Sequence, residues 1–530
     1  MRGSVGRMRC WPGYLAWSCW IVSLCGLSGC WGEDRSLPSS PVKPSFPGVK
    51  LAVGALGDSA ILTGLSAQRG EWVASRGGDI TIKDEPVRSL ENLSDLDLLI
   101  FPGQELGNLV DAEVLELIPN QIVLPTRPQE QEDESAKAGR TESTEESPTE
   151  AFQYPDIAPV FREQVTKYGA DRMALPMGAS ALVLVYRRDA FSRPANLDAA
   201  HEAGITLQPP STWAQLDALA GFFQGRDWSG DGAPDHGIAA VLGQDSEGLG
   251  NTTYLARATS LAQHRDQYSF LFDADSMTPR IDSPPFVEAL RSVTAWKRHG
   301  PPGIDRFDGP AAREAFRAGK AALLIDRAER ALAWSGGHAV GVAPLPGSER
   351  VFEPLRQQWE TSSSLNAPSY LPMGGGWLVG VKRGLSGLQL DAALDLARYL
   401  ASPENANRLR AEATFPMLPV RSSQMGHGLP DPTSAPDVDS RQWSDAVSRT
   451  LMAGRVVPGL RIPEAAGYLE DLARARVAAL DGKDPEIVLR EVSQAWAART
   501  KARGTQRQLW HYRRSLNSLA TLPQPPEHGK

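Results

Sequence analysis

Short apolar segments alternate with amphipathic helical segments along the first part of the chain, and this alternation restricts the fold more than any other feature. Val49–Ala55, Asp79–Lys83 and Leu98–Phe101 are predicted strands, and a helix is expected from about Ser59. Strands that alternate with helices in this way form a mostly parallel sheet with helices on both faces. The sequence therefore predicts an α/β fold.

The length and charge of the chain indicate its domain count and its class of partner. Its 530 residues exceed what one hydrophobic core organises, so two domains are expected. The chain holds 55 Lys and Arg against 63 Asp and Glu, and three of the arginines lie in residues 1–29, which contain no acid. The remainder carries a net charge of about −11, which argues against a nucleic-acid partner.

The first 29 residues have the layout of a secretory signal. A basic start with three arginines precedes an apolar run from about Tyr14 to Leu27. This run is shorter than the roughly 20 residues needed to cross the hydrocarbon core of a membrane. Residues 1–29 are therefore predicted to be a signal peptide that is removed.

The end of this segment, Leu27-Ser28-Gly29-Cys30, resembles the lipobox of bacterial lipoproteins. The resemblance implies cleavage before Cys30, a diacylglycerol on its thiol and acylation of the new amino terminus, and several acyl chains anchor a protein stably. The body would then lie outside the cytoplasm, anchored to a bacterial membrane on the periplasmic side or at the cell surface. An uncleaved apolar anchor is the alternative. Because the other three cysteines precede Cys30, no disulfide framework is expected in the body.

Two segments of biased composition flank or interrupt the predicted fold. Residues 30–47 are rich in Pro, Ser and Gly, and they are predicted to be a flexible tether. Residues 126–151 are dominated by Glu, Ser, Thr and Gln, so they cannot bury enough apolar surface to offset the entropy of ordering. A disordered acidic insertion is predicted there, and an acidic recognition segment is the alternative.

Several short motifs follow one another in a recognisable order between about residues 50 and 480. They are DLLIFPG at 97–103, ALPMG at 174–178, YRRDAF at 186–191, PSTW at 210–213, AFRAGKAA at 315–322, GVAPLPG at 341–347, GGGW at 374–377, YLASPE at 399–404 and PVR at 419–421. In order and spacing they resemble the extracellular solute-binding proteins of ATP-driven importers. The resemblance is to family 1, the sugar-binding branch related to maltose-binding protein.

The resemblance implies a periplasmic-binding-protein-like fold, in which two α/β lobes with discontinuous segments are joined by hinge strands around a ligand cleft. The expected N-terminal lobe comprises residues 48–178 plus about 315–374. The expected C-terminal lobe comprises 179–314 plus about 375–485, and 486–530 form a C-terminal extension. The implied function is to capture a small solute, a sugar or oligosaccharide, and to deliver it to the permease subunits of an ABC transporter. A monomer without enzymatic activity or an obligatory cofactor is expected.

Residues for the ligand site come from strand ends and from the resemblance. Loops at the carboxyl ends of strands gather at the ligand site of open α/β sheets, which favours Asp58, Ser59, Gln104 and Glu105. Sugars bind aromatic platforms together with hydrogen-bonding side chains. The positions at which the family touches ligand add a further set of residues: Met177, Gly178, Trp334, Gly375, Gly376 and Trp377. Aromatic packing under the hinge is the alternative for both tryptophans.

One loop reproduces the first part of a calcium-binding loop. Asp227, Ser229, Asp231 and Asp235 occupy relative positions 1, 3, 5 and 9, with glycine at position 6. Position 12 is Ile238, where an EF-hand needs a bidentate Glu. Calcium is thus a candidate ligand, and a tight Asp/Gly turn is the alternative.

The motifs of common enzyme classes are absent from the sequence. It contains no Gly-x-Ser-x-Gly elbow, no His-Glu-x-x-His and no phosphate-binding glycine loop. An extracytoplasmic glycan-acting hydrolase would need two carboxylates facing each other across a cleft, and the sequence singles out no such pair. This hydrolase and a receptor that senses without transport are the alternatives to a transport receptor.

Overall fold

The computed structural model describes residues 45–57, 60–83, 85–87, 90–123, 152–411, 417–428 and 434–517. The predicted signal peptide, the lipidation residue Cys30, most of the predicted tether and the acidic insertion lie outside these residues. Asp58 and Ser59 also lie outside them. In the described part, no helix is both long and apolar enough to span a membrane.

The first sheet contains the strands predicted from the start of the chain. Its order is β2-β1-β3-β14-β6. The bounds are β1 Lys50–Ala55, β2 Asp79–Ile82, β3 Leu98–Pro102, β6 Leu175–Ala179 and β14 Gly376–Val381. β1 runs parallel to β2 and β3, as predicted, whereas β14 is antiparallel to both β3 and β6.

The second sheet has the order β10-β7-β9-β8. Its strands are β7 Leu182–Arg187, β8 His236–Ala239, β9 Ala321–Arg327 and β10 Val340–Pro344. Only the β8–β9 pair is parallel, while β7 is antiparallel to β9 and to β10. This sheet is therefore mostly antiparallel.

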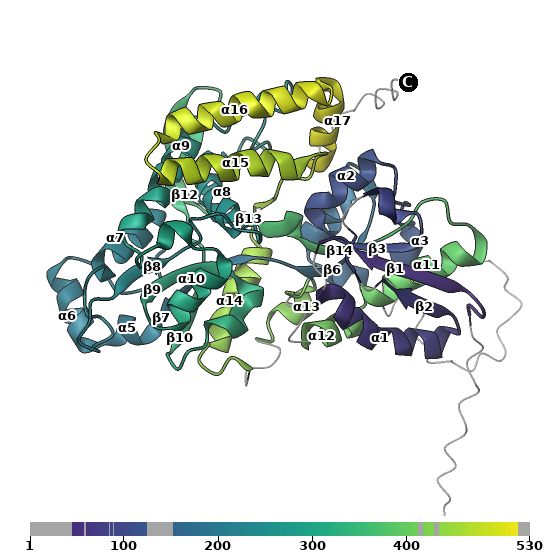
Figure 1. Cartoon of the computed structure of the whole chain (residues 1–530), viewed down its shortest axis with the longest axis horizontal. Coiled ribbons are helices and arrows are strands. Elements are labelled where there is room, and N and C mark those ends of the chain that lie inside the picture. Colours follow the sequence, from purple (N-terminus) through teal and green to yellow (C-terminus); the bar gives the residue numbers. More distant parts are fainter. Residues whose placement is uncertain are drawn as a thin grey trace, which may run out of the picture. The chain divides into compact units, whose positions relative to one another are not determined.

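The two predicted α/β lobes are present, but two segments were assigned to the wrong lobe. Residues 315–374 were expected in the N-terminal lobe, yet β9 and β10 belong to the second sheet. Residues from about 375 were expected in the C-terminal lobe, yet β14 lies between β3 and β6 of the first sheet (Figure 1). All six residues of β14 are buried, which indicates a central strand but not which sheet receives it.

Helices cover both sheets. Those associated with the first sheet are α1 Ala60–Arg76, α2 Leu106–Asp111, α3 Asn120–Val123, α11 Gly387–Leu400, α12 Pro403–Ala411 and α13 Ser422–Met425. Those associated with the second are α5 Arg188–Ser192, α6 Pro194–Glu202, α7 Trp213–Phe223, α8 Leu249–Ala262, α9 Pro284–Ala295, α10 Gly309–Arg317 and α14 Ser440–Leu451. α7 begins with a capping box, in which Thr212 Oγ1 accepts from the Gln215 amide at 3.2 Å and the Gln215 side chain accepts in return from the Thr212 amide.

Shorter strands of the described residues form separate two-stranded sheets. β4 Lys167–Tyr168 pairs with β5 Asp171–Arg172, and β11 Ser348–Glu353 forms a hairpin with β12 Gln358–Asn366. β13 Ser369–Leu371 pairs with β15 Val456–Pro458 just before the chain enters β14. Only Ser180 and Ala181 separate β6 of the first sheet from β7 of the second.

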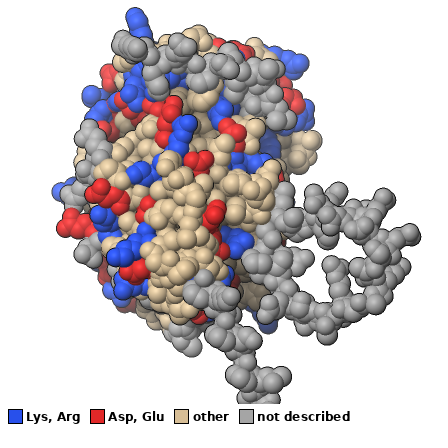
Figure 2. All heavy atoms as spheres, turned by 90° about the vertical axis from the view of Figure 1, so that its right-hand side faces the viewer, with Lys and Arg blue, Asp and Glu red and all other residues tan. Residues whose placement is uncertain are grey.

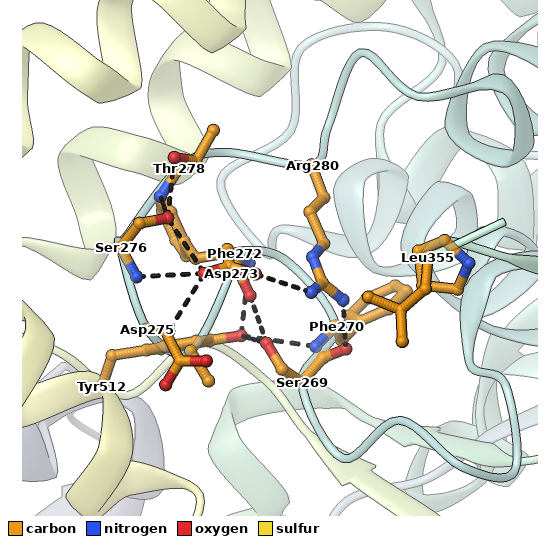
Figure 3. A network of polar contacts seen from close by, with 12 residues as sticks. Ser269, Phe270, Phe272, Asp273, Asp275, Ser276, Thr278, Arg280, Leu355 and Tyr512 are labelled. Carbon is orange, nitrogen blue, oxygen red and sulfur yellow. Dashed lines mark hydrogen bonds and ion pairs between the residues drawn. The ribbon is translucent and has the colours of Figure 1, made fainter. Parts of the chain in front are cut away.

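The described part of the predicted C-terminal extension belongs to the folded body. α15 Ala465–Leu480 and α16 Pro485–Ala502 lie side by side (Figure 1), and the buried Trp496 donates from Nε1 to the Tyr468 carbonyl at 2.9 Å. α17 Thr505–Ser515 places Tyr512 against the loop at residues 269–272 (Figure 3). The carboxyl-terminal helices therefore contribute to the core.

Candidate functional site

A cavity of about 680 Å³ lies where the carboxyl ends of β1, β3 and β9 meet the start of β14. Gly57, Gln104 and Trp377 line it from the first lobe. Glu247 and Arg327 line it from the second lobe, so both lobes contribute to one cleft. This volume is within the range typical of small-molecule sites, about 300–1,000 Å³.

Two of the predicted ligand residues line the cleft. Gln104 follows β3 in the short helix Gly103–Glu105, and Trp377 is the second residue of β14. The Trp377 ring is mostly buried, with 8% of the residue exposed, and its outer edge approaches Gly57. The ring therefore packs in the sheet and its edge also reaches the cleft, where contact with a ligand stays a prediction.

The other predicted ligand residues that the structure describes do not line the cleft. Glu105 accepts from Asn108 Nδ2 at 2.7 Å, Met177 is 1% exposed within β6, and Gly178 packs against Met417. Trp334 is fully buried, and its Nε1 donates to Asp326 Oδ2 at 2.8 Å, as the packing alternative expects.

Gly375 and Gly376 instead form the bend that carries the chain into β14. Met373, Gly374, Gly375 and Gly376 have φ angles of 55°, 70°, 111° and 134°, a run of four residues in a region that favours glycine. Gly374 also packs directly on the backbone of Gly103 and Gln104, where a Cβ would collide. The glycines therefore allow close backbone contact beside the cleft, and Met373 lines the cleft with a strained backbone.

A charged network that the sequence analysis missed forms the floor of the cleft. Glu247, in the loop before α8, accepts from Arg313 Nη2 at 2.5 Å and from Arg327 Nη2 at 2.5 Å. Burial opposes its ionised form, but hydrogen bonds and charge from both arginines lower the pKa of Glu247 to about 2. Arg313 also binds the fully buried Asp326 at 3.1 Å. Arg327 ends β9, so the strand-end argument applied to Gln104 could have found it.

A second carboxyl group of the cleft belongs to Glu329. It accepts from the hydroxyl of Ser180, which lies in the two-residue crossing between the lobes. Burial of the carboxyl group raises the pKa of Glu329, despite the nearby charge of Arg327. The contact links the floor of the cleft to a lobe crossing.

The predicted calcium loop has the geometry of a tight turn with converging carboxylates. Asp227 accepts from the amides of Gly230 and Gly232 at 2.7 and 3.1 Å, and Asp235 accepts from the Ser229 amide at 2.9 Å. Oxygens of Asp227, Asp231 and Asp235 lie within 4.8 Å of one another. These residues fit a cation as well as a turn, and they lie apart from the cleft lining.

The surface drawn in Figure 2 mixes charges of both signs. Lys and Arg are interspersed with Asp and Glu around a central uncharged area on this face. This face shows no large patch of positive charge that would suit a polyanion.

Two α/β lobes with chain crossings between them and a cleft lined by both define a periplasmic-binding-protein-like receptor for a small ligand. The sequence profile described as bacterial extracellular solute-binding protein matches residues 90–424, which is more than half of the chain. The chain therefore belongs to this family. No curated protein matches the sequence.

Solved structures with a similar fold are solute-binding proteins of ABC transporters and sugar-binding proteins. One is the ribitol complex of an ABC transporter solute-binding protein from Agrobacterium radiobacter, with 19% identity, a TM-score of 0.59, and coverage of 86% of this chain and 100% of that chain. Maltose-bound MalE3 of T. maritima has 17% identity, a TM-score of 0.56 and coverage of 85% and 99%. The sugar-binding protein MalE of Xanthomonas citri has 16% identity, a TM-score of 0.58 and coverage of 86% and 99%. At these identities the likeness establishes the fold.

Proposed function

We propose that the protein is a lipid-anchored extracytoplasmic receptor that captures a sugar or oligosaccharide in its cleft and delivers it to the permease of an ABC transporter. The observation that carries this proposal is the position of Trp377, whose ring edge lies near Gly57 in a cleft that Gln104 also lines. An aromatic edge with hydrogen-bonding groups around it suits the C–H faces and hydroxyl groups of a sugar. Similar structures contain maltose, ribitol or tagatose, which supports a carbohydrate or polyol ligand.

Thermal unfolding of the purified protein with a panel of sugars and polyols tests the proposal. A ligand at 100 times its dissociation constant adds about 2.7 kcal/mol to the stability of the folded state, so a true ligand raises the melting temperature. The same samples are analysed for cleavage products. Absence of any shift across the panel would contradict the proposal, and cleavage of an oligosaccharide would favour a glycan hydrolase.

Delivery to a permease is tested by uptake in cells. Deletion of the protein is expected to abolish import of the ligand found in the panel, whereas a sensory receptor would alter gene expression and leave uptake intact. The lipid anchor is tested in the same cells. Cys30→Ser is expected to prevent incorporation of radiolabelled palmitate and to release the protein from membranes or leave it uncleaved. Palmitate on this variant would contradict anchoring through Cys30.

Calcium binding by Asp227, Asp231 and Asp235 is a separate proposal, supported by the convergence of their carboxylates. Isothermal titration with CaCl₂ is expected to show one weak site, because no bidentate Glu completes the loop. Asp231→Asn is expected to remove that site and to leave sugar binding unchanged. Identical titrations of the variant and the unmodified protein would contradict the assignment.

A further inference from the structure

Two arginines in the cleft have hydrogen-bond donors without partners among the described residues. Arg327 is 7% exposed, and it uses Nη2 on Glu247 and Nη1 on the Met373 thioether at 3.4 Å. A thioether is a weak acceptor, and Arg327 Nε has no partner within the described part of the chain. Arg330 lines the same cavity, and its buried Nε has no partner there either. The cleft therefore presents unused cationic donors.

Acceptors of the cleft lining are, by contrast, largely in use. Both oxygens of Glu247 are taken by Arg313 and Arg327. The Asn251 side chain accepts from Arg476 Nε at 3.2 Å and donates to the Leu469 carbonyl at 2.7 Å. A ligand that fits this lining must bring acceptors more than donors.

The charges in and around the cleft also favour a ligand that brings hydrogen-bond acceptors. Arg327 and Arg330 line the cleft, whereas Arg313 is outside the lining and pairs with both Glu247 and the buried Asp326. Glu247 is ionised at neutral pH, because its pKa is about 2, but it is shared between two arginines. Burial raises the pKa of Glu329, and its carboxyl group already accepts from the Ser180 hydroxyl. The guanidinium of Arg330 forms no direct ion pair with the described residues, although the Glu329 carboxyl group is close enough to interact with its charge.

From this surplus of cationic donors we infer that the solute is an acidic carbohydrate, whose oxyanion binds at Arg327 and Arg330 while its ring occupies the cleft beside Trp377. The inference rests on the proposed function, since it names the class of solute for the same site. Guanidinium groups bind carboxylate, sulfate and phosphate through paired, charge-assisted hydrogen bonds. The cavity of about 680 Å³ leaves room for at least one sugar ring besides the anionic group.

Matched ligand pairs test the inference on the intact protein by isothermal titration calorimetry. Galactose is compared with galacturonic acid and glucose with glucuronic acid, each as monomer and as dimer. Glucose 6-sulfate and glucose 6-phosphate distinguish a carboxylate from other oxyanions. At least one acidic ligand is expected to bind about tenfold or more tightly than its neutral partner, the factor of one charge-assisted hydrogen bond.

Variants then locate the anion. Arg330→Gln is expected to remove the preference for the acidic ligand, because it takes away a guanidinium group of the cleft lining that has no hydrogen bond to the described residues. Arg327→Lys keeps the charge but loses the paired geometry, so it is expected to weaken the acidic ligand as well. Arg298→Gln removes an equal charge from an exposed position outside the cleft and serves as the control.

The outcomes separate this inference from the proposed function. If the neutral sugar of each pair binds more tightly than the acidic one, or equally tightly, the inference of an acidic carbohydrate is overturned. The proposed capture of a carbohydrate would still stand. An acidic preference that survives both cleft variants would overturn the assignment to these arginines. Binding of neither member of any pair, together with a negative sugar panel, would overturn the inference and the proposed function together.

Discussion

The hydroxyl of Tyr512 is expected to hold the carboxyl-terminal helix α17 on the second lobe. Its oxygen accepts from the amides of Phe270 at 3.3 Å and Phe272 at 3.2 Å, and it lies 3.1 Å from Ser269 Oγ (Figure 3). The ring is 3% exposed and packs edge-on against Phe272, with centroids 5.3 Å apart. Burial raises the pKa of Tyr512, so the phenol stays protonated at neutral pH.

Tyr512→Phe keeps the ring and removes only this oxygen. The amides of Phe270 and Phe272 then lose a partner in a buried environment, and an unsatisfied buried donor costs about 1–3 kcal/mol. Since the two amides share one acceptor, we expect a total loss of about 2–4 kcal/mol in the free energy of unfolding. Urea denaturation followed by tryptophan fluorescence measures it.

Tyr268→Phe is the matched control, because Tyr268 is 57% exposed in the same loop. This variant is expected to unfold at the urea concentration of the unmodified protein. If Tyr512→Phe also unfolds there, α17 does not contribute to the cooperative core, and the reasoning is refuted.

Three other substitutions separate binding from stability. Trp377→Phe withdraws the ring edge from the cleft and is expected to weaken ligand affinity by about 1–2 kcal/mol in calorimetry. Because the ring is mostly buried, it is also expected to cost about 1 kcal/mol of unliganded stability, which urea denaturation measures separately. Trp334→Phe removes the donor to buried Asp326 and is expected to cost about 1–3 kcal/mol of stability in urea without affecting affinity. Glu247→Gln tests the effect of the lowered pKa of Glu247. The ionised carboxylate stabilises the fold above pH 4.5, and this stabilisation is lost as the pH falls towards 2. The variant and the unmodified protein should therefore differ in unfolding free energy by about 3 kcal/mol near pH 6, and this difference should vanish between pH 4.5 and 2. A difference that stays constant with pH would contradict the lowered pKa.

The sequence predicts local structure well because local structure depends on neighbouring residues. The alternation of apolar residues in Asp79–Lys83 and the apolar run Leu98–Phe101 identify β2 and β3, and Gln104 follows from the position of a strand end. The family itself follows from motifs that are each short but occur in order.

Sheet membership is not predictable in the same way, since it depends on pairing between distant segments. The apolar residues of β9 and β14 are buried on both faces, so neither pattern says which sheet the strand joins. This is why 315–374 and the segment from 375 were exchanged between the lobes.

The candidate site also depends partly on local sequence patterns and partly on contacts between distant segments. Trp334 and Trp377 were both predicted to contact the ligand, yet only Trp377 reaches the cleft, because Trp334 turns inward to Asp326. Glu247 was missed because its importance arises from Arg313 and Arg327, which lie 66 and 80 residues away in the chain. No local pattern encodes such a contact.

Hydrogen–deuterium exchange with and without a saturating ligand from the sugar panel tests the central claim, that the carbohydrate binds in the cleft lined by both lobes. We expect slower exchange on ligand binding at residues 102–104 of the first lobe, at 246–255 of the second, and at 370–377 between β13 and β14. Slower exchange confined to one lobe, or located away from these segments, would contradict it.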